Sequence, residues 1–188
     1  MKRCGWILPA ALTVLFGSHH QAVAAGAFTL TSSDFKDGER LPQKFAGNRK
    51  GNANCVGENI SPELSWSNPP EGTKSFALMM FDPEGRPPGG VSHFVVYDIP
   101  ASVSSFAQGE LSKASDKFVS GIGTAKEQNY TGPCTPAGAP HHYTFTLIAT
   151  DLDPKALKEG LTREEVIKEL DGHAKSATGL IGTFSHPE

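Results

Sequence analysis

The feature that most constrains the fold is a run of six apolar residues, Phe76-Ala77-Leu78-Met79-Met80-Phe81. Polar and turn-forming residues bound this run, with Lys74-Ser75 before it and Asp82-Pro83 after it. Six residues are too few for a typical helix, and an extended run of this kind presents apolar side chains on both of its faces. The run therefore predicts a central β-strand that is buried on both sides.

Two further segments alternate apolar and polar residues in the manner of half-buried strands. They are Phe28-Thr29-Leu30-Thr31 and Tyr143-Thr144-Phe145-Thr146-Leu147. Stretches rich in glycine and proline separate such segments, and the two longest span residues 83–90 and 132–140. The pattern indicates a mainly β fold with long connecting loops.

One helix is predicted from Thr162 to about Ala177. Thr162 and Glu165 have the spacing of a capping box, and Gly179 lies where a C-terminal cap is expected. An apolar stripe with helical spacing is formed by Val166, Ile167, Leu170, Ala174 and Ala177. We interpret the helix as structural and packed on a sheet, with His173 a packed or half-exposed side chain and not a ligand.

The N-terminus has the three parts of a secretory signal peptide. Lys2 and Arg3 precede the mostly apolar residues 7–16, and the small-residue pattern Ala22-Val23-Ala24 follows. We expect cleavage after Ala24, with cleavage after Ala25 as the alternative. The apolar core is about half the length that a membrane span requires, so we expect an exported, periplasmic protein with no stable membrane insertion. Residues 25–188 suit a single domain.

Charge and cysteine content narrow the possible partners. Without residues 1–24, 15 basic residues face 20 acidic ones, and the net charge of about -5 argues against nucleic acid. Cys55 and Cys134 remain as an even pair in an oxidising compartment, which predicts a disulfide. Two buried free thiols are the alternative. A metal site at these cysteines is less favoured, because neither has a Cys-x-x-Cys spacing.

Three polar residues lie where loops meet apolar runs, and together they outline a candidate anion site. Asp82 closes the central run, His93 opens Phe94-Val95-Val96-Tyr97, and His141 opens the segment that begins at Tyr143. Binding groups concentrate at strand ends, because the scaffold fixes them while solvent still reaches them. If residues 83–92 form a hairpin, Asp82 faces His93, fixes its ring and favours the protonated imidazole, which donates to an oxyanion.

Other groups can complete this site. His141 can supply a second donor, and backbone N–H groups near Gly132 can cradle a phosphate. Tyr143 lies two residues after His141 and points to the same side of the strand. Each residue alone has a commoner explanation, since an aspartate before proline often starts a turn and a strand-edge histidine is usually solvated. The prediction of an anion site therefore depends on these residues occurring together.

Four motifs occur in order along the chain and carry a resemblance to a known family. They are Gly57-Glu58-Asn59-Ile60-Ser61-Pro62-Glu63-Leu64-Ser65-Trp66, Phe81-Asp82-Pro83-Glu84, His93-Phe94-Val95-Val96-Tyr97-Asp98-Ile99-Pro100, and Gly132-Pro133-Cys134-Thr135-Pro136 with His141-His142-Tyr143. This set resembles the phosphatidylethanolamine-binding protein family, and within it the bacterial branch described as Raf kinase inhibitor-like. The resemblance covers essentially the whole mature chain.

The resemblance implies a mainly β fold in which a large antiparallel sheet packs on a smaller sheet, with a C-terminal α-helix. It also implies an anion pocket, with Trp66 in the core. The implied pocket residues are Asp82, His93 and His141, with Tyr143, Gly132, Pro133 and Pro136 on the walls. The chain departs from the family pattern at Glu84-Gly85-Arg86, at Cys134-Thr135 and at His142, where the family usually has arginine. Arg86 is an extra charge near the mouth, although a solvated loop arginine is the commoner case.

The first functional hypothesis is a periplasmic binding protein for a phosphate-bearing small molecule or a phospholipid headgroup. It needs no cofactor or metal, has no enzymatic activity, and binds more tightly as the pH falls through the histidine range. A protein-interaction module that inhibits or modulates a protease or signalling partner is the alternative. A hydrolase with an Asp–His pair acting on water is less favoured, because the chain lacks a Gly-x-Ser-x-Gly motif. Two histidines and a carboxylate can also hold a metal ion.

Overall fold

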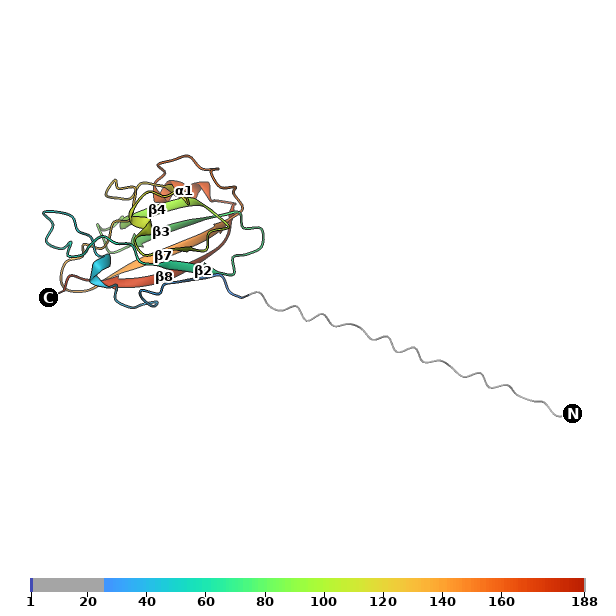
Figure 1. Cartoon of the computed structure of the whole chain (residues 1–188), viewed down its shortest axis with the longest axis horizontal. Coiled ribbons are helices and arrows are strands. Elements are labelled where there is room, and N and C mark those ends of the chain that lie inside the picture. The colour runs from blue at the N-terminus through green and yellow to red at the C-terminus, as the bar shows by residue number, and fades with distance from the viewer. Residues whose placement is uncertain (2–25, 188) are drawn as a thin grey trace.

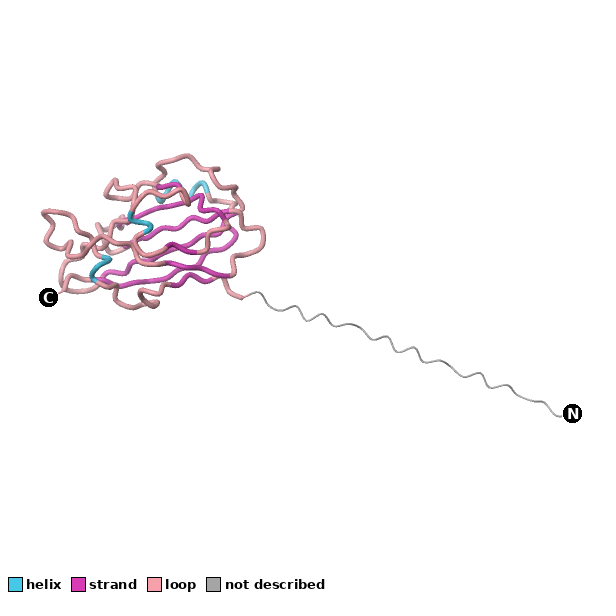
Figure 2. The backbone as a smooth tube through the Cα atoms, in the orientation of Figure 1, coloured by secondary structure: helices cyan, strands magenta, loops and turns pink. Residues whose placement is uncertain are grey.

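The computed structural model describes Met1 and residues 26–187, so the predicted signal peptide lies outside the described residues except for Met1. Two antiparallel sheets form the structure, one with five strands and one with three (Figure 1). Loops make up most of the remainder, and the helices are short (Figure 2). None of the helices in this part of the chain is long and apolar enough to cross a membrane.

The five-stranded sheet has the order β6-β4-β3-β7-β8, and its neighbouring strands pair antiparallel. Its strands, in chain order, are β3 (Ser75–Asp82), β4 (Val91–Pro100), β6 (Val119–Ser120), β7 (His141–Thr150) and β8 (Ala174–Phe184). β3 holds the central position, and seven of its eight residues are buried. The prediction of a central strand buried on both sides is confirmed.

The three-stranded sheet covers one face of the large sheet. Its strands are β1 (Thr29–Thr31), β2 (Leu64–Ser67) and β5 (Ser105–Phe106), and two short 3-10 helices, η1 (Gln43–Phe45) and η2 (Glu110–Ser112), lie in the connecting loops. The main core fills the space between the sheets. Trp66 is buried there and meets the ring of Phe76 edge-on, with 5.5 Å between ring centroids. Its predicted place in the core is confirmed, as is the fold class.

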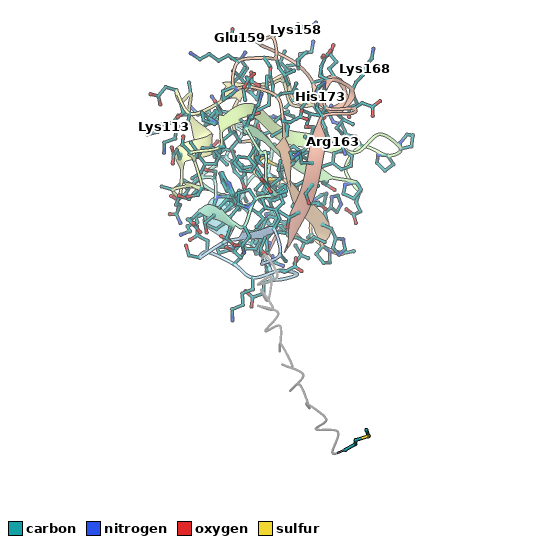
Figure 3. All side chains as sticks on the ribbon, turned by 90° about the vertical axis from the view of Figure 1, so that its right-hand side faces the viewer. Lys113, Lys158, Glu159, Arg163, Lys168 and His173 are labelled. Atoms are coloured by element: carbon teal, nitrogen blue, oxygen red, sulfur yellow. A yellow bond between two sulfur atoms is a disulfide. The ribbon has the colours of Figure 1, made fainter. Side chains whose placement is uncertain are left out.

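The opposite face of the large sheet carries the single α-helix of the described residues, α1 (Arg163–Glu169). Val166 and Leu170 pack there with Met79, Val95 and Tyr97 in a second apolar cluster. Lys158, Glu159 and Lys168 project outward around this helix (Figure 3). The helix therefore covers a sheet face, as the prediction required.

The predicted length of the helix was wrong, although its start was right. Thr162 and Glu165 form the expected capping box, but the helix ends at Glu169, and residues 174–184 form β8. Gly172 has a φ of +79°, a conformation that ends a helix readily. The ladder to β7 then satisfies the backbone from Ala174 onward, and this long-range pairing outweighs the helical spacing of the alanines. His173 lies in the turn, exposed, and donates from its ring to Asp151 at 2.8 Å.

Candidate functional site

A cavity of about 370 Å³ lies where β3, β4 and β7 meet their loops, and we call it the strand-end pocket. Six of the seven predicted ligand-binding residues line it: Asp82, His93, Gly132, Pro136, His141 and Tyr143. Pro133 was predicted on the wall but is buried behind it, where its carbonyl accepts the N–H of Gly47 at 2.8 Å. The loop between β3 and β4 and the segment 124–136 close the remaining sides.

Asp82 holds His141 and not His93, which corrects the predicted pairing. The carboxylate is buried, and its Oδ2 accepts the Nδ1–H of His141 at 2.8 Å. Its Oδ1 accepts the backbone N–H groups of Glu84 and Gly85, each at 2.9 Å. The prediction considered only the hairpin partner β4, whereas β3 also pairs with β7 on its other side. Asp82 thus fixes both the histidine of β7 and the turn after β3.

His93 is buried and is oriented by the backbone. Its Nδ1–H donates to the carbonyl of Thr131 at 2.6 Å, and its ring meets Tyr143 edge-on with 5.2 Å between centroids. Burial lowers the pKa of His93, and it outweighs the hydrogen bond to Thr131 and the charge of Asp82, which act in the opposite direction. Asp82 acts in the expected direction, toward the protonated imidazole, but burial has the larger effect on the pKa of His93. The Nε2 atom is buried and has no partner among the described residues.

The wall from Thr131 to Pro136 is fixed by its own contacts. The N–H of Gly132 donates to Asn59 Oδ1 at 2.8 Å, so it is not free to cradle a phosphate as predicted. A side chain at Gly132 would fall on the carbonyl of Phe45, which explains the glycine. The hydroxyls of Thr135 and Tyr143 are hydrogen-bonded to each other, and burial raises the pKa of Tyr143, which stays a neutral phenol.

The predicted disulfide between Cys55 and Cys134 is present. Cys134 lines the pocket, so the bond joins this wall to the loop before Cys55. The bond spans 79 positions in the sequence, and the separation of the two Cα atoms is 4.4 Å. The departure from the family pattern at Cys134 is therefore a covalent tether of the pocket wall.

Two arginines line the pocket, one of which the sequence reasoning missed. Arg49 comes from the loop before the disulfide, and Arg86 from the loop between β3 and β4. Neither guanidinium has an ion pair or a side-chain hydrogen bond within residues 26–187. The sequence signal that could have found Arg49 is its place in the loop just before Cys55, since the predicted disulfide brings that loop to Cys134. The pocket that His93 and His141 line therefore also carries two arginine charges, which do not titrate in the pH range of histidine.

His142 and Glu84 form a second histidine–carboxylate pair, on the rim. The ring Nδ1–H of His142 donates to Glu84 at 2.8 Å. Burial acts to raise the pKa of Glu84, but the hydrogen bonds from His142 outweigh it, and the pKa of this exposed carboxyl lies below its usual value. The pair ties the loop after β3 to the start of β7. His142 thus has a positioning contact where the family usually has arginine.

The fold and this pocket place the chain in a class of β proteins with a polar pocket at the strand ends. A family model described as phosphatidylethanolamine-binding protein matches residues 31–185. The chain belongs to the phosphatidylethanolamine-binding protein family, as its motifs predicted.

Solved structures and a curated relative agree with this assignment. The crystal structure of Escherichia coli YbcL, described as a member of the mammalian PEBP family, has a TM-score of 0.76 and 28% identity, covering 84% of this chain and 98% of YbcL. The PEBP homologue CT736 from Chlamydia trachomatis has a TM-score of 0.73 and 34% identity, covering 86% of this chain and 99% of CT736. LppC of Mycobacterium tuberculosis, described as a lipoprotein, is 33% identical over 169 residues, which are 87% of this chain and 75% of LppC.

Proposed function

We propose that this protein is an exported, periplasmic binding protein whose single domain captures a phosphate group in the strand-end pocket. The observation that carries the proposal is that His93 lines the pocket and that its buried Nε2 atom has no hydrogen-bond partner among the described residues. Buried polar groups are normally hydrogen-bonded, and an orphaned one calls for an explanation. A bound anion beside His93 and His141 would supply the missing partner.

The hydrogen bonds of the two imidazoles fix what each can offer a ligand. His93 and His141 both use the Nδ1 hydrogen, one toward Thr131 and the other toward Asp82. In a neutral imidazole the remaining Nε2 is an acceptor, and it becomes a donor only when the ring is protonated. The pocket can therefore hold a fully ionised phosphate by taking up protons, or a protonated phosphate that donates to Nε2. Arg49 and Arg86 add fixed charge.

The test is calorimetric titration of the mature protein with inorganic phosphate at about pH 6 and about pH 8. His93→Ala and His141→Ala should each weaken binding by about 10-fold to 100-fold, because each removes a hydrogen bond to a charged group. His173→Ala is the matched control, since His173 also pairs with a carboxylate but does not line the pocket. Unchanged phosphate affinity in both pocket variants would reject the proposal.

The N-terminal pattern and the similarity to LppC support the proposed export. Expression of the full chain in a bacterium, followed by periplasmic extraction and N-terminal sequencing, tests it. The expected mature chain begins at Ala25 or Gly26. A chain that keeps Lys2 and Arg3 and stays with the cytosol would contradict the localisation without bearing on the pocket.

The hydrogen bond between Asp82 and His141 favours one second candidate, a hydrolase. A carboxylate at Nδ1 orients the imidazole so that Nε2 can remove a proton from a water molecule, as in a catalytic Asp–His pair. A phosphate-ester substrate would then be consumed. Incubation with p-nitrophenyl phosphate separates the two functions, because turnover that is lost in His141→Ala would establish the enzyme, and binding without turnover would leave the binding protein.

A further inference from the structure

A second cavity, of about 290 Å³, adjoins the strand-end pocket. Arg49, Thr131 and Cys134 line both cavities, so the two adjoin at these residues. We call the second cavity the amide recess, because three asparagines line it: Asn48, Asn59 and Asn129. Arg49 is the charged residue that lines both cavities.

Part of the wall of the amide recess is held in place by internal hydrogen bonds. The side chain of Asn59 donates to the carbonyl of Tyr130 at 3.0 Å and accepts the N–H of Gly132 at 2.8 Å. The hydroxyl of Ser112 donates to the carbonyl of Asn59 at 2.9 Å. These groups are engaged and form a rigid frame around the cavity.

Other lining groups are not engaged. Asn129 Oδ1 is buried and has no hydrogen-bond partner in the part of the chain that the structure describes. Glu127 and Arg49 form no ion pair there. The residues that line the recess thus include an asparagine with an unpaired amide oxygen, a carboxylate and a guanidinium, and the charges of Glu127 and Arg49 balance. A neutral ligand group that both donates and accepts hydrogen bonds fits this set.

A hydroxyl group has this property, because it carries one donor and two acceptor sites. Its hydrogen can meet Glu127 or Asn129, and its oxygen can accept from Arg49. An ammonium group donates only, and it would lie beside the like charge of the guanidinium. The chemistry of the amide recess therefore favours hydroxyl groups over an amine.

We propose that the amide recess is a second subsite that binds the hydroxyl-bearing part of a phosphate ester. The preferred ligand class is then a phosphorylated polyhydroxy alcohol, such as a sugar phosphate or a glycerol phosphate. This inference rests on the proposed function, since the strand-end pocket would hold the phosphate while the recess holds the alcohol. The amide recess thereby specifies the class of phosphate ester, which the strand-end pocket alone does not.

The test compares four probes by calorimetry on the mature protein: inorganic phosphate, glycerol 3-phosphate, glucose 6-phosphate and phosphoethanolamine. The two polyol phosphates should bind at least about tenfold more tightly than inorganic phosphate, the gain expected for one hydrogen bond to a charged group. Phosphoethanolamine should show no such gain. Equal affinities for all four probes, or an equal gain with phosphoethanolamine, would overturn the inference.

Two variants test whether the tighter binding of the polyol phosphates comes from the amide recess. Glu127→Ala and Asn129→Ala should abolish the advantage of the polyol phosphates and leave the affinity for inorganic phosphate unchanged. Glu127 is exposed, so its removal should not disturb folding, and exposed Gln128, which does not line the recess, supplies the control Gln128→Ala. An advantage that survives in both variants would overturn the second subsite alone. Failure of inorganic phosphate and of every ester to bind would instead reject the proposed function, and the second subsite with it.

Discussion

The two ends of the five-stranded sheet bury polar side chains in opposite ways. At the end away from the pocket, Ser75, Thr150 and Asp98 are buried and all have partners. Ser75 donates to the carbonyl of Leu152 at 2.8 Å and lies 3.2 Å from the hydroxyl of Thr150. Asp98 accepts the N–H of Leu157 at 3.2 Å. At this end the buried polar side chains of the five-stranded sheet itself are therefore satisfied by other groups of the protein.

At the pocket end, buried polar atoms remain without partners. Asp82 is fully engaged, but Ser92 Oγ and His93 Nε2 are buried with no hydrogen bond among the described residues. An unmade hydrogen bond in a buried position costs free energy, about 1–3 kcal/mol for each group. The difference indicates that the buried polar groups of the far end stabilise the fold. The unsatisfied groups at the pocket end lower the stability of the free protein, and a ligand that bonds to them can restore it.

Removal of the disulfide should have the largest effect on stability, and it tests the pocket end directly because the bond tethers the pocket wall. Replacing both cysteines in Cys55→Ser with Cys134→Ser should lower the free energy of unfolding by about 4 kcal/mol, since the unfolded chain regains the freedom of a long loop. Urea denaturation measures the loss. Dithiothreitol should reproduce it in the wild type and leave the double variant unchanged. A loss below about 1 kcal/mol would show that the wall is held by its hydrogen bonds instead.

Two serine variants sharpen the comparison, because the same deletion is made at each end. Ser75→Ala removes a satisfied hydroxyl and should cost about 1–2 kcal/mol of stability. Ser92→Ala removes an unsatisfied hydroxyl and should be neutral or stabilising by up to about 1 kcal/mol. The measured quantity is the shift of the urea midpoint. Equal destabilisation by both variants would show that Ser92 has a partner, and the contrast between the ends would then fail.

The parts of the fold that were predictable from the sequence are those with strong local patterns. The apolar run of β3 has one plausible environment, between two packed layers, and the capping box at Thr162 marks the start of α1. The end of α1 was not predictable, because Ala174 and Ala177 fit a helical stripe as well as an edge strand. Pairing of Ala174 with Thr150 and of Ala177 with Ile148 in β7, which lie 24 and 29 positions earlier, decides between them, and no local pattern reports it.

The candidate site shows the same limit. Each strand-end residue was found from its neighbours in the sequence, but its partner depends on which strands lie side by side. The bond between Asp82 and His141 spans 59 positions, and the bond that engages the N–H of Gly132 spans 73. Arg49 reaches the pocket from a loop that is placed by a disulfide. The positions of the site residues and the single disulfide were therefore predictable, whereas the hydrogen-bond partners of those residues were not.

The dependence of stability on acidic pH is the smallest expected effect, and it reports on His93 specifically. Burial lowers the pKa of His93 below the ordinary histidine value of 6.5, so the unfolded chain binds this proton more readily than the folded protein does. Stability is therefore lost as the pH falls from about 6.5 toward the lowered pKa of the folded state. Asp98 acts in the opposite direction, because burial raises its pKa above the ordinary aspartate value of 3.8. The folded protein therefore gains stability as the pH falls from that raised pKa toward 3.8 and the carboxyl is protonated.

Binding of sulfate, measured as a function of pH, reports the protonation of the pocket histidines alone. Sulfate keeps its charge over the pH range of histidine titration, whereas phosphate does not. Neither imidazole can donate from Nε2 while neutral, so sulfate binding should take up protons and should tighten as the pH falls. Calorimetry at one pH in buffers of different ionisation enthalpy counts the protons. His93→Leu should bind sulfate with less proton uptake, and its stability should vary less with pH than that of the wild type. Sulfate binding without proton uptake would mean that the arginines alone hold the anion, and that the unpaired nitrogen at this end of the sheet has no part in binding.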